Sequence, residues 1–372
     1  MIKTTLVGHA CLLIQSKETT ILTDPVWFDY LWEEINTLCP SIVLEKDKVP
    51  PLDVLNISHR HQDHFDVRTL AYLVKNKRIL TPDTLVLAPQ DNLLLDILNE
   101  LEFKNIRIVA DFEPIKVKDV TITPTPSRNQ LSTSEDPFPE HGLLVNDGEV
   151  TIWNQVDSLV NPDIIQHIIE LHGQIDFFHS RFVPLIEGNF SYNKPITLPI
   201  DEYCTFLNVV KALAPRFVVP GSAAFRYRDE LTFLNQYSFP TTQDQFLRDL
   251  EAFCPEVSRA PFFSGDIAHI SKDEIYIEKQ ASDFVRIKED NSQLITFKPN
   301  SEVPAIKTQT TDPEEYQREI KVVDDFIEKY FLERILKSDL LKGWQHWQIV
   351  YQLEVFGQDG PQAWTIDFGQ PK

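Results

Sequence analysis

Three histidines and one aspartate fall within six consecutive positions of this chain, at His59, His61, Asp63 and His64. Imidazole and carboxylate groups are common protein ligands of transition metals such as zinc and iron. The four residues directly follow residues 54–58, a nearly apolar run that is typical of a strand buried on both faces. A loop at the end of such a strand can direct closely spaced ligands toward one centre. The pattern therefore predicts a metal site at this strand end.

The spacing within the motif favours two metal ions over one. His59 and His61 are alternate residues and can point in the same direction, whereas Asp63 and His64 lie just past the turn, where a helix is expected to begin. Two ions about 3.5–4 Å apart can share a bridging water or carboxylate. A lone histidine is usually an ordinary core or surface residue, but this clustering after an apolar strand is not expected by chance.

The elements that must position these ligands alternate between short strands and helices. Residues 11–14, 20–23 and 84–88 have the composition of strands, and residues 66–75 and 92–101 have the pattern of helices. Strands that are buried between helices in this order predict a layered α/β sandwich.

A change of pattern near Tyr276 divides the chain. We predict a metal-binding α/β domain over residues 1–275 and a small α+β extension over residues 276–372. Within the extension, the polar residues 300–312 have the composition of a linker.

The extension is expected to contain a helix and a hairpin. Asp312 can cap a helix whose first turn is acidic. Apolar and polar residues then alternate over residues 347–355 and 364–368, on either side of a turn at Asp359, which predicts a hairpin with one buried face. Its aromatic residues are expected to form a core rather than to line a substrate pocket.

Composition excludes several classes of protein. A formal net charge of −21 disfavours a nucleic-acid partner, because such binders need clustered lysine and arginine. No apolar run reaches the length of about 18 residues that spans a bilayer, so no membrane association is expected. The cysteines form no C-x-x-C pair, which predicts a reducing cytoplasm and no disulfide framework; they are Cys11, Cys39, Cys204 and Cys254.

The string His59-Arg60-His61-Gln62-Asp63-His64 resembles the H-x-H-x-D-H signature of the metallo-β-lactamase superfamily. Residues 8–14 resemble the first strand of that fold, and residues 23–25 resemble its T-D-P turn. The resemblance covers about residues 1–270 and implies an αββα sandwich, with Asp24 supporting the metal site. His9 would lie near the site, either in the same supporting role or as an ordinary buried histidine.

The later motifs of the superfamily are less complete here. The bridging aspartate corresponds to Asp157, which the resemblance implies as a ligand and, together with Asp63, as a catalytic residue. Near the third motif, Glu140 or His141 could supply the ligand, and neither lies at the usual offset. The final histidine should follow the strand at residues 216–219, but no histidine is present there.

This departure changes the expected chemistry. A set of metal ligands that is richer in carboxylates and leaves coordination positions open suits iron that must bind oxygen. Zinc hydrolases, in contrast, usually complete their sites with imidazole. Residues 140–145 and 153–157 resemble the CMP-N-acetylneuraminate hydroxylase family, which keeps the fold and uses oxygen. That family also carries a Rieske iron–sulfur centre, for which this chain has no suitable Cys/His pairs. The resemblance therefore implies that electrons come from a separate donor protein.

We thus predict a dinuclear-metal enzyme, preferably a diiron hydroxylase or oxidase that acts on a small organic substrate. The main alternative is a lactonase- or phosphodiesterase-type hydrolase with zinc or manganese, and a third is a degenerate scaffold that serves as a partner protein. Arg181, Arg226 and Arg228 are candidates for binding an anionic group of the substrate. Arg226 and Arg228 can equally be surface charge, and for Arg181 a surface ion pair is the favoured alternative.

Overall fold

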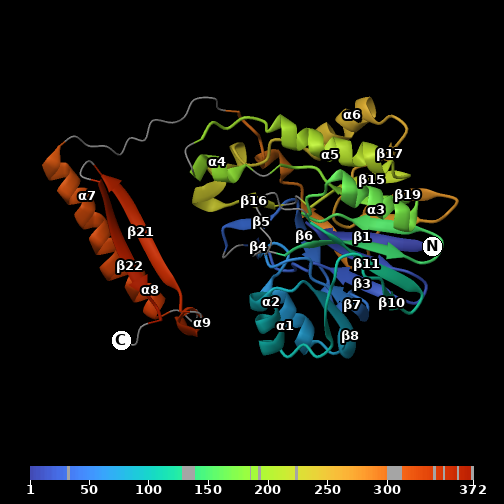
Figure 1. The fold of residues 1–372 in the computed structure, drawn as a ribbon, viewed down its shortest axis with the longest axis horizontal. Helices are drawn as coiled ribbons and strands as arrows, with labels where there is room; N and C mark the ends of the chain where they lie inside the picture. The colour runs from blue at the N-terminus through green and yellow to red at the C-terminus, as the bar shows by residue number, and fades with distance from the viewer. Residues whose placement is uncertain are drawn as a thin grey trace. The chain divides into compact units, whose positions relative to one another are not determined.

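The computed structural model describes residues 1–31, 34–127, 139–184, 186–191, 194–222, 225–299, 312–337, 341–346, 348–357 and 360–369. The chain forms two compact units, Met1–Glu302 and Val303–Lys372 (Figure 1). Among the described residues, none of the helices is both long and apolar enough to cross a membrane.

Two sheets form the centre of the first unit. The eight-stranded sheet has the order β19 (Ile275–Glu278), β18 (Ile267–Ile270), β1 (Ile2–Gly8), β2 (Cys11–Gln15), β3 (Thr20–Thr23), β7 (Leu52–Asn56), β8 (Leu80–Ala88), β9 (Ile106–Ile108). The seven-stranded sheet has the order β10 (Ile115–Val117), β11 (Val120–Pro126), β12 (His141–Asn146), β13 (Thr151–Asn154), β14 (Phe177–Arg181), β15 (Phe217–Gly221), β17 (Ser258–Arg259).

The sheets pack face to face through a shared apolar core. Leu12 and Val54 from the first sheet belong to one buried cluster with Ile122, Leu143 and Phe177 from the second. Alternate residues of these strands point to the opposite faces, where helices cover them. The helices that flank the sheets are α1 (Val67–Lys75), α2 (Asn92–Glu100), α3 (Pro162–His172), α5 (Ile200–Leu213) and α6 (Gln243–Phe253).

Figure 1 shows α1 and α2 beside β7 and β8, and α5 and α6 on the opposite side of the first unit, near β15. The arrangement of helices, two sheets and helices confirms the αββα sandwich. Side chains fix where the helices begin, because they accept hydrogen bonds from otherwise unpaired N–H groups. Asp66 caps α1, Asp91 caps α2 and Asn161 caps α3.

The first unit continues past residue 275, where the sequence pattern placed the end of the domain. β19 pairs with β18, and β20 (Val285–Glu289) pairs with β6 (Ser41–Leu44), which comes early in the sequence of the unit. The compact unit therefore extends to Glu302. Most of the expected linker lies outside the described residues.

The second unit contains helices and a hairpin. α7 (Pro313–Asp325) continues through a π-helical turn, Phe326–Phe331, into α8 (Leu332–Leu336), and α9 (Leu341–His346) follows. The hairpin consists of β21 (Val350–Gly357) and β22 (Gly360–Asp367), and its expected residues Trp347 and Asp359 lie outside the described part. The Trp364 indole donates to Asp324 of α7 at 2.7 Å, so the hairpin packs on the helix.

Candidate metal centre

The His59–His64 segment leaves the end of β7 beside the end of β3. These two strands are parallel, and Thr23 pairs with Asn56, so the residues that follow each strand lie next to each other. The backbone N–H of Asp24 donates to the carbonyl of Asn56 at 2.9 Å. The backbone N–H of Ser58 in turn donates to Asp24 Oδ1 at 2.7 Å.

The second carboxylate oxygen of Asp24 orients a ligand. Asp24 Oδ2 accepts a hydrogen bond from the Ser58 hydroxyl at 2.7 Å and lies 3.1 Å from His64 Nδ1. A buried carboxylate beside Nδ1 favours the tautomer with the proton on that nitrogen, so that His64 Nε2 presents its lone pair to the site. Asp24 thus has the geometry of the supporting residue that the resemblance implied.

One group of candidate ligand atoms joins the motif to the end of β1. His9 Nε2 lies 3.0 Å from Asp63 Oδ2 and 3.4 Å from His64 Nε2. The distance from His64 Nε2 to Asp63 Oδ2 is 3.6 Å. All three side chains are buried, and together they form a group that could hold a metal ion.

A second group shares His64 with the first and adds His59 and Asp157. His64 Nε2 lies 3.4 Å from Asp157 Oδ2. His59 Nδ1 is 2.9 Å from the Ser58 hydroxyl, and its Nε2 is 2.9 Å from Nδ1 of the exposed His61. The two groups therefore adjoin at His64, so that two ions held by them would be neighbours.

The charges around His64 indicate that the centre is built for a cation. Burial alone lowers the pKa of His64, but the carboxylates of Asp63 and Asp157 raise that pKa well above its usual value. Burial alone raises the pKa of both carboxyls, and positive charge on His64 holds their pKa values well below the usual range. The buried Asp63 carboxylate and the half-buried Asp157 carboxylate converge on imidazole nitrogens, and a metal ion can supply the positive charge that they need.

Glu140 lies near this centre, and His141 points elsewhere. The Glu140 carboxylate accepts a hydrogen bond from the Ser127 hydroxyl and interacts electrostatically with Asp157 and His64. Burial raises the pKa of Glu140. His141 Nε2 lies 2.9 Å from Asn56 Oδ1, where it links β12 to β7 and belongs to neither ligand group. Of the two candidates from the third motif, Glu140 is the better placed, while the neighbouring residues 128–138 lie outside the described part.

The three candidate arginines have structural contacts of their own. Arg181 donates from Nη1 to the backbone carbonyl of Asp157 at 2.5 Å, and therefore holds the loop that carries this ligand. Arg228 lies over the ring of Tyr30, with Cζ 3.9 Å from the centroid, and pairs with Asp229 at 2.8 Å. Arg226 donates to the carbonyl of Tyr227 at 3.3 Å. A role for these arginines in substrate binding stays a prediction.

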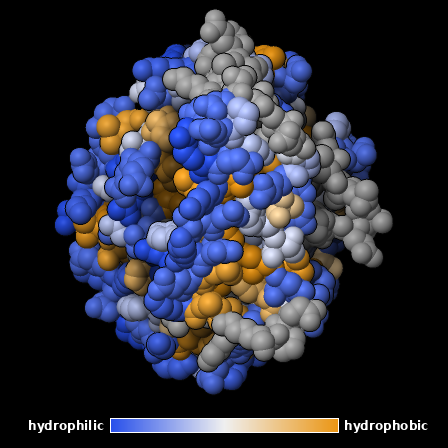
Figure 2. Space-filling view, turned by 90° about the vertical axis from the view of Figure 1, so that its left-hand side faces the viewer, coloured by the Kyte–Doolittle hydropathy of each residue, from blue (hydrophilic) through white to orange (hydrophobic). Residues whose placement is uncertain are grey.

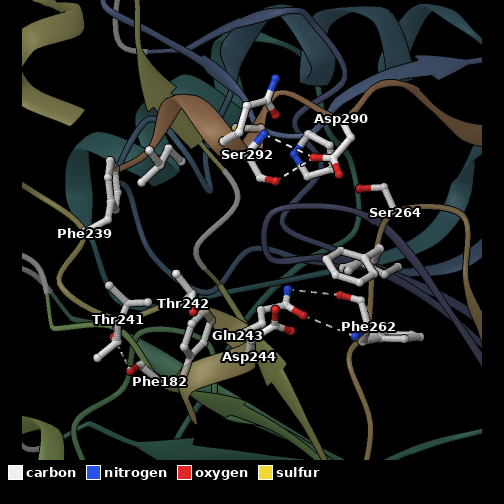
Figure 3. Close-up of a pocket in the computed structure, with 17 residues that line it drawn as sticks. Phe182, Phe239, Thr241, Thr242, Gln243, Asp244, Phe262, Ser264, Asp290 and Ser292 are labelled. Carbon is white, nitrogen blue, oxygen red and sulfur yellow. Dashed lines mark hydrogen bonds between the residues drawn. The ribbon is translucent and has the colours of Figure 1, made fainter. Parts of the chain in front are cut away.

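The first unit contains a cavity of about 440 Å³, and Figure 3 shows residues that line it. Its apolar wall includes Phe182, Phe239 and Phe262, and Figure 3 shows Asp290 and Ser292 across the cavity from Gln243. Phe225 packs both against this wall and against His9. Its ring centroid lies 5.6 Å from that of His9 and 5.1 Å from that of Phe239.

The sequence gives no signal for this cavity, because its lining comes from widely separated segments. The described lining residues are Leu6, Cys39, Pro40, Phe182, Val183, Phe239, Thr241, Thr242, Gln243, Asp244, Phe262, Phe263, Ser264, Asp290, Ser292, Gln293 and Ile295. A volume of this size lies within the range of about 300–1,000 Å³ that is usual for sites of small molecules.

The space-filling view in Figure 2 shows one face of the molecule, on which hydrophilic residues surround smaller hydrophobic areas.

Comparisons with known proteins match the first unit of the chain. A family model described as a beta-lactamase superfamily domain matches residues 3–222. A protein named as a Rieske 2Fe-2S iron-sulfur protein, from Mycolicibacterium smegmatis, is 28% identical over 200 residues, which cover 51% of this chain and 36% of the relative. The 4-amino-L-phenylalanyl-[CmlP-peptidyl-carrier-protein] 3-hydroxylase of Streptomyces venezuelae is 27% identical over 174 residues, which cover 46% of this chain and 32% of the relative.

The matched part spans about a third of the length of these two relatives. Among solved structures, the isothiocyanate hydrolase from Delia radicum gut bacteria superposes with a TM-score of 0.51 at 17% identity, over 73% of this chain and 100% of that chain. This likeness concerns the fold alone. The family model, the two-sheet sandwich and the His59–His64 ligands together identify the chain as a member of the metallo-β-lactamase superfamily.

Proposed function

We propose that this chain is a dinuclear-iron enzyme that uses O2 to hydroxylate or oxidise a small organic substrate. The observation that carries the proposal is the composition of the ligand groups, to which Asp63 and Asp157 contribute carboxylates and near which Glu140 lies. Residues 219–225, where the superfamily places its final histidine, contain none. Such a set favours iron over zinc. The printed name of the Streptomyces venezuelae relative, a 3-hydroxylase, supports the same class of reaction.

The residues have separate tasks in this proposal. In this proposal His59, His61, Glu140 and Asp157 would hold one ion, and Asp63, His64 and Asp157 would hold the second. Asp24 fixes the orientation of His64 through its Nδ1, and Arg181 fixes the loop of Asp157. The buried positions of His59, Asp63 and His64 keep bulk water away from the centre.

When bound, two reduced irons supply the chemistry that activates O2. In a hydroxylation, one oxygen atom enters a C–H bond of the substrate and the other leaves as water. The balance requires two electrons and two protons in addition to O2. We assign the electrons to a separate redox protein, since the chain has no cysteine pair with the spacing of an iron–sulfur centre.

The rival function is hydrolysis of a lactone or phosphodiester with zinc or manganese. Its support is the complete H-x-H-x-D-H string, which suits two ions that activate water. Metal analysis and oxygen uptake separate the two functions. We expect the anaerobically reconstituted protein to bind about two irons per chain and to consume O2 when a reductant is added.

About two zinc ions per chain, with no oxygen uptake after addition of iron and reductant, would instead establish the hydrolase. The His61→Ala variant tests the third alternative, a scaffold without catalysis. Because His61 is exposed and lies beside His59, we expect this variant to fold normally but to lose oxygen uptake by at least about 100-fold. Oxygen uptake equal to that of the wild type would contradict its role as a ligand.

The cavity beside His9 is the proposed binding site for the apolar part of the substrate. We expect the neutral probe N-phenyl-1-naphthylamine to bind there and to increase its fluorescence. Gln293 lines the cavity and is exposed, so the Gln293→Trp variant should fill the space without disturbing the core, and should weaken binding of the probe by about tenfold.

The neighbouring Leu294 offers a matched control, because it is exposed and is not part of the cavity lining. The Leu294→Trp variant should bind the probe as the wild type does. Equal binding by both tryptophan variants and the wild type would show that the probe, and with it the proposed substrate, binds elsewhere.

A further inference from the structure

We infer that His9 is a ligand of the second metal ion and supplies the imidazole that is missing after β15. The inference rests on the dinuclear site proposed above. From the sequence alone, His9 was expected to support the site or to be an ordinary buried histidine. The structure instead places its Nε2 among the ligand atoms of Asp63 and His64.

The distances between the three ligand atoms suit a single ion. Nitrogen and oxygen ligands lie about 2.0–2.2 Å from a metal such as zinc, so neighbouring ligand atoms around one ion are about 3.0–3.6 Å apart. The separations here are 3.0 Å from His9 to Asp63, 3.4 Å from His9 to His64 and 3.6 Å from His64 to Asp63. All three distances fall within that range.

The backbone directs His9 toward the site. β1 pairs regularly with β2 up to Leu6, and the register then shifts between Leu6 and Gly8. His9 follows with a φ of 51°, a left-handed conformation that is uncommon for residues other than glycine, although asparagine, aspartate and histidine adopt it more often than most. This turn points the imidazole toward His64 instead of along the strand, and the two rings meet edge to face with centroids 5.0 Å apart.

Residues 219–225 contain no histidine, and Phe225 at the start of β16 (Phe225–Tyr227) packs edge to face on His9. Phe225 and His9 are both almost completely buried, at 5% and 2% exposure. The phenyl ring therefore prevents the imidazole from turning away from Asp63. His9, the ligand that follows β1, and Phe225, the residue at the start of β16 that packs on it, together replace the usual single histidine.

Metal binding by the His9→Asn variant tests this inference. Asparagine tolerates the positive φ but has a shorter side chain that cannot place a donor at the position of Nε2. We expect the wild type to bind two zinc ions per chain in equilibrium dialysis and the variant to retain one, with the affinity for the second ion weakened by more than about 100-fold. Loss of a residue that merely supports a ligand costs about 10–100-fold.

His179 provides a matched control. It is 1% exposed and lies on β14, between β13 and β15. Its Nδ1 lies 2.8 Å from Asn154 Oδ1, and it belongs to neither ligand group. The His179→Asn variant should therefore still bind two ions. Two tightly bound ions in the His9→Asn variant would refute the inference and leave the proposed function standing, whereas fewer than two ions in the wild type would refute the proposed function itself.

A measurement on the wild type covers the case in which a variant does not fold. Long-range 1H–15N spectra of the zinc-loaded, histidine-labelled protein count the imidazole rings with a coordinated nitrogen. We expect four, from His9, His59, His61 and His64. Three coordinated rings would leave His9 as a neighbour of the site and overturn the inference.

Discussion

The Asp157→Asn variant is expected to lose metal-dependent turnover by at least about 1,000-fold. Asp157 supplies the carboxylate of the group that it forms with His59 and His64, and its Oδ2 lies 3.4 Å from His64 Nε2, which both groups share. Asparagine keeps the size of the side chain but removes the negative charge that a bridging ligand supplies to two cations. We therefore expect Asp157→Asn to lower the affinity for both ions, whereas His9→Asn should lower the affinity for one.

The measurement is the metal content after dialysis, together with the rate of oxygen uptake. Asp96 on the exposed face of α2 serves as a control, because Asp96→Asn makes the same chemical change away from the site. Thermal unfolding in the presence of EDTA should be similar for the two variants and the wild type. An Asp157→Asn variant that still binds two ions tightly would show that this carboxylate is not the bridge.

The Gly221→Ala variant is expected to lower the free energy of unfolding by about 2–3 kcal/mol, which is typical of an overpacked core. A Cβ at Gly221 would lie 2.5 Å from His179 Nε2 and 2.6 Å from two carbons of the same ring. The ring cannot move away easily, because it is buried and its Nδ1 is bonded to Asn154. Chemical denaturation of the metal-free protein measures the effect.

A double-mutant cycle separates this clash from other effects of the substitution. In a His179→Ala background the ring is absent, so adding the methyl group of Gly221→Ala should cost less than about 0.5 kcal/mol. An equal cost in both backgrounds would mean that the backbone of β15, rather than the imidazole, requires glycine at this position.

The sequence predicted those parts of the site that depend on neighbouring residues. His59, His61, Asp63 and His64 are adjacent in the chain, and their signature also predicted the sandwich. Asp24 follows a recognisable turn, so its place beside His64 could be expected from the resemblance. The Asp157 assignment likewise came from an order of strands that the family shares.

Features that arise from pairing between distant segments could not be predicted. Whether His9 is a ligand depends on the register shift in β1 and on the packing of Phe225, more than 200 residues away. The extent of the first unit also depends on the pairing of β20 with β6, which joins segments with no local pattern in common. The cavity depends on six or more separate segments and has no periodic signature.

The ligands of the centre come from both sheets, and this gives the metals a mechanical role. His9, Asp63 and His64 follow strands of the eight-stranded sheet, whereas Asp157 follows a strand of the seven-stranded sheet. Ions held by residues of both sheets would cross-link one sheet to the other. The two sheets could then separate only after an ion dissociated, so that the lifetime of the folded protein would be set by the rate of metal dissociation.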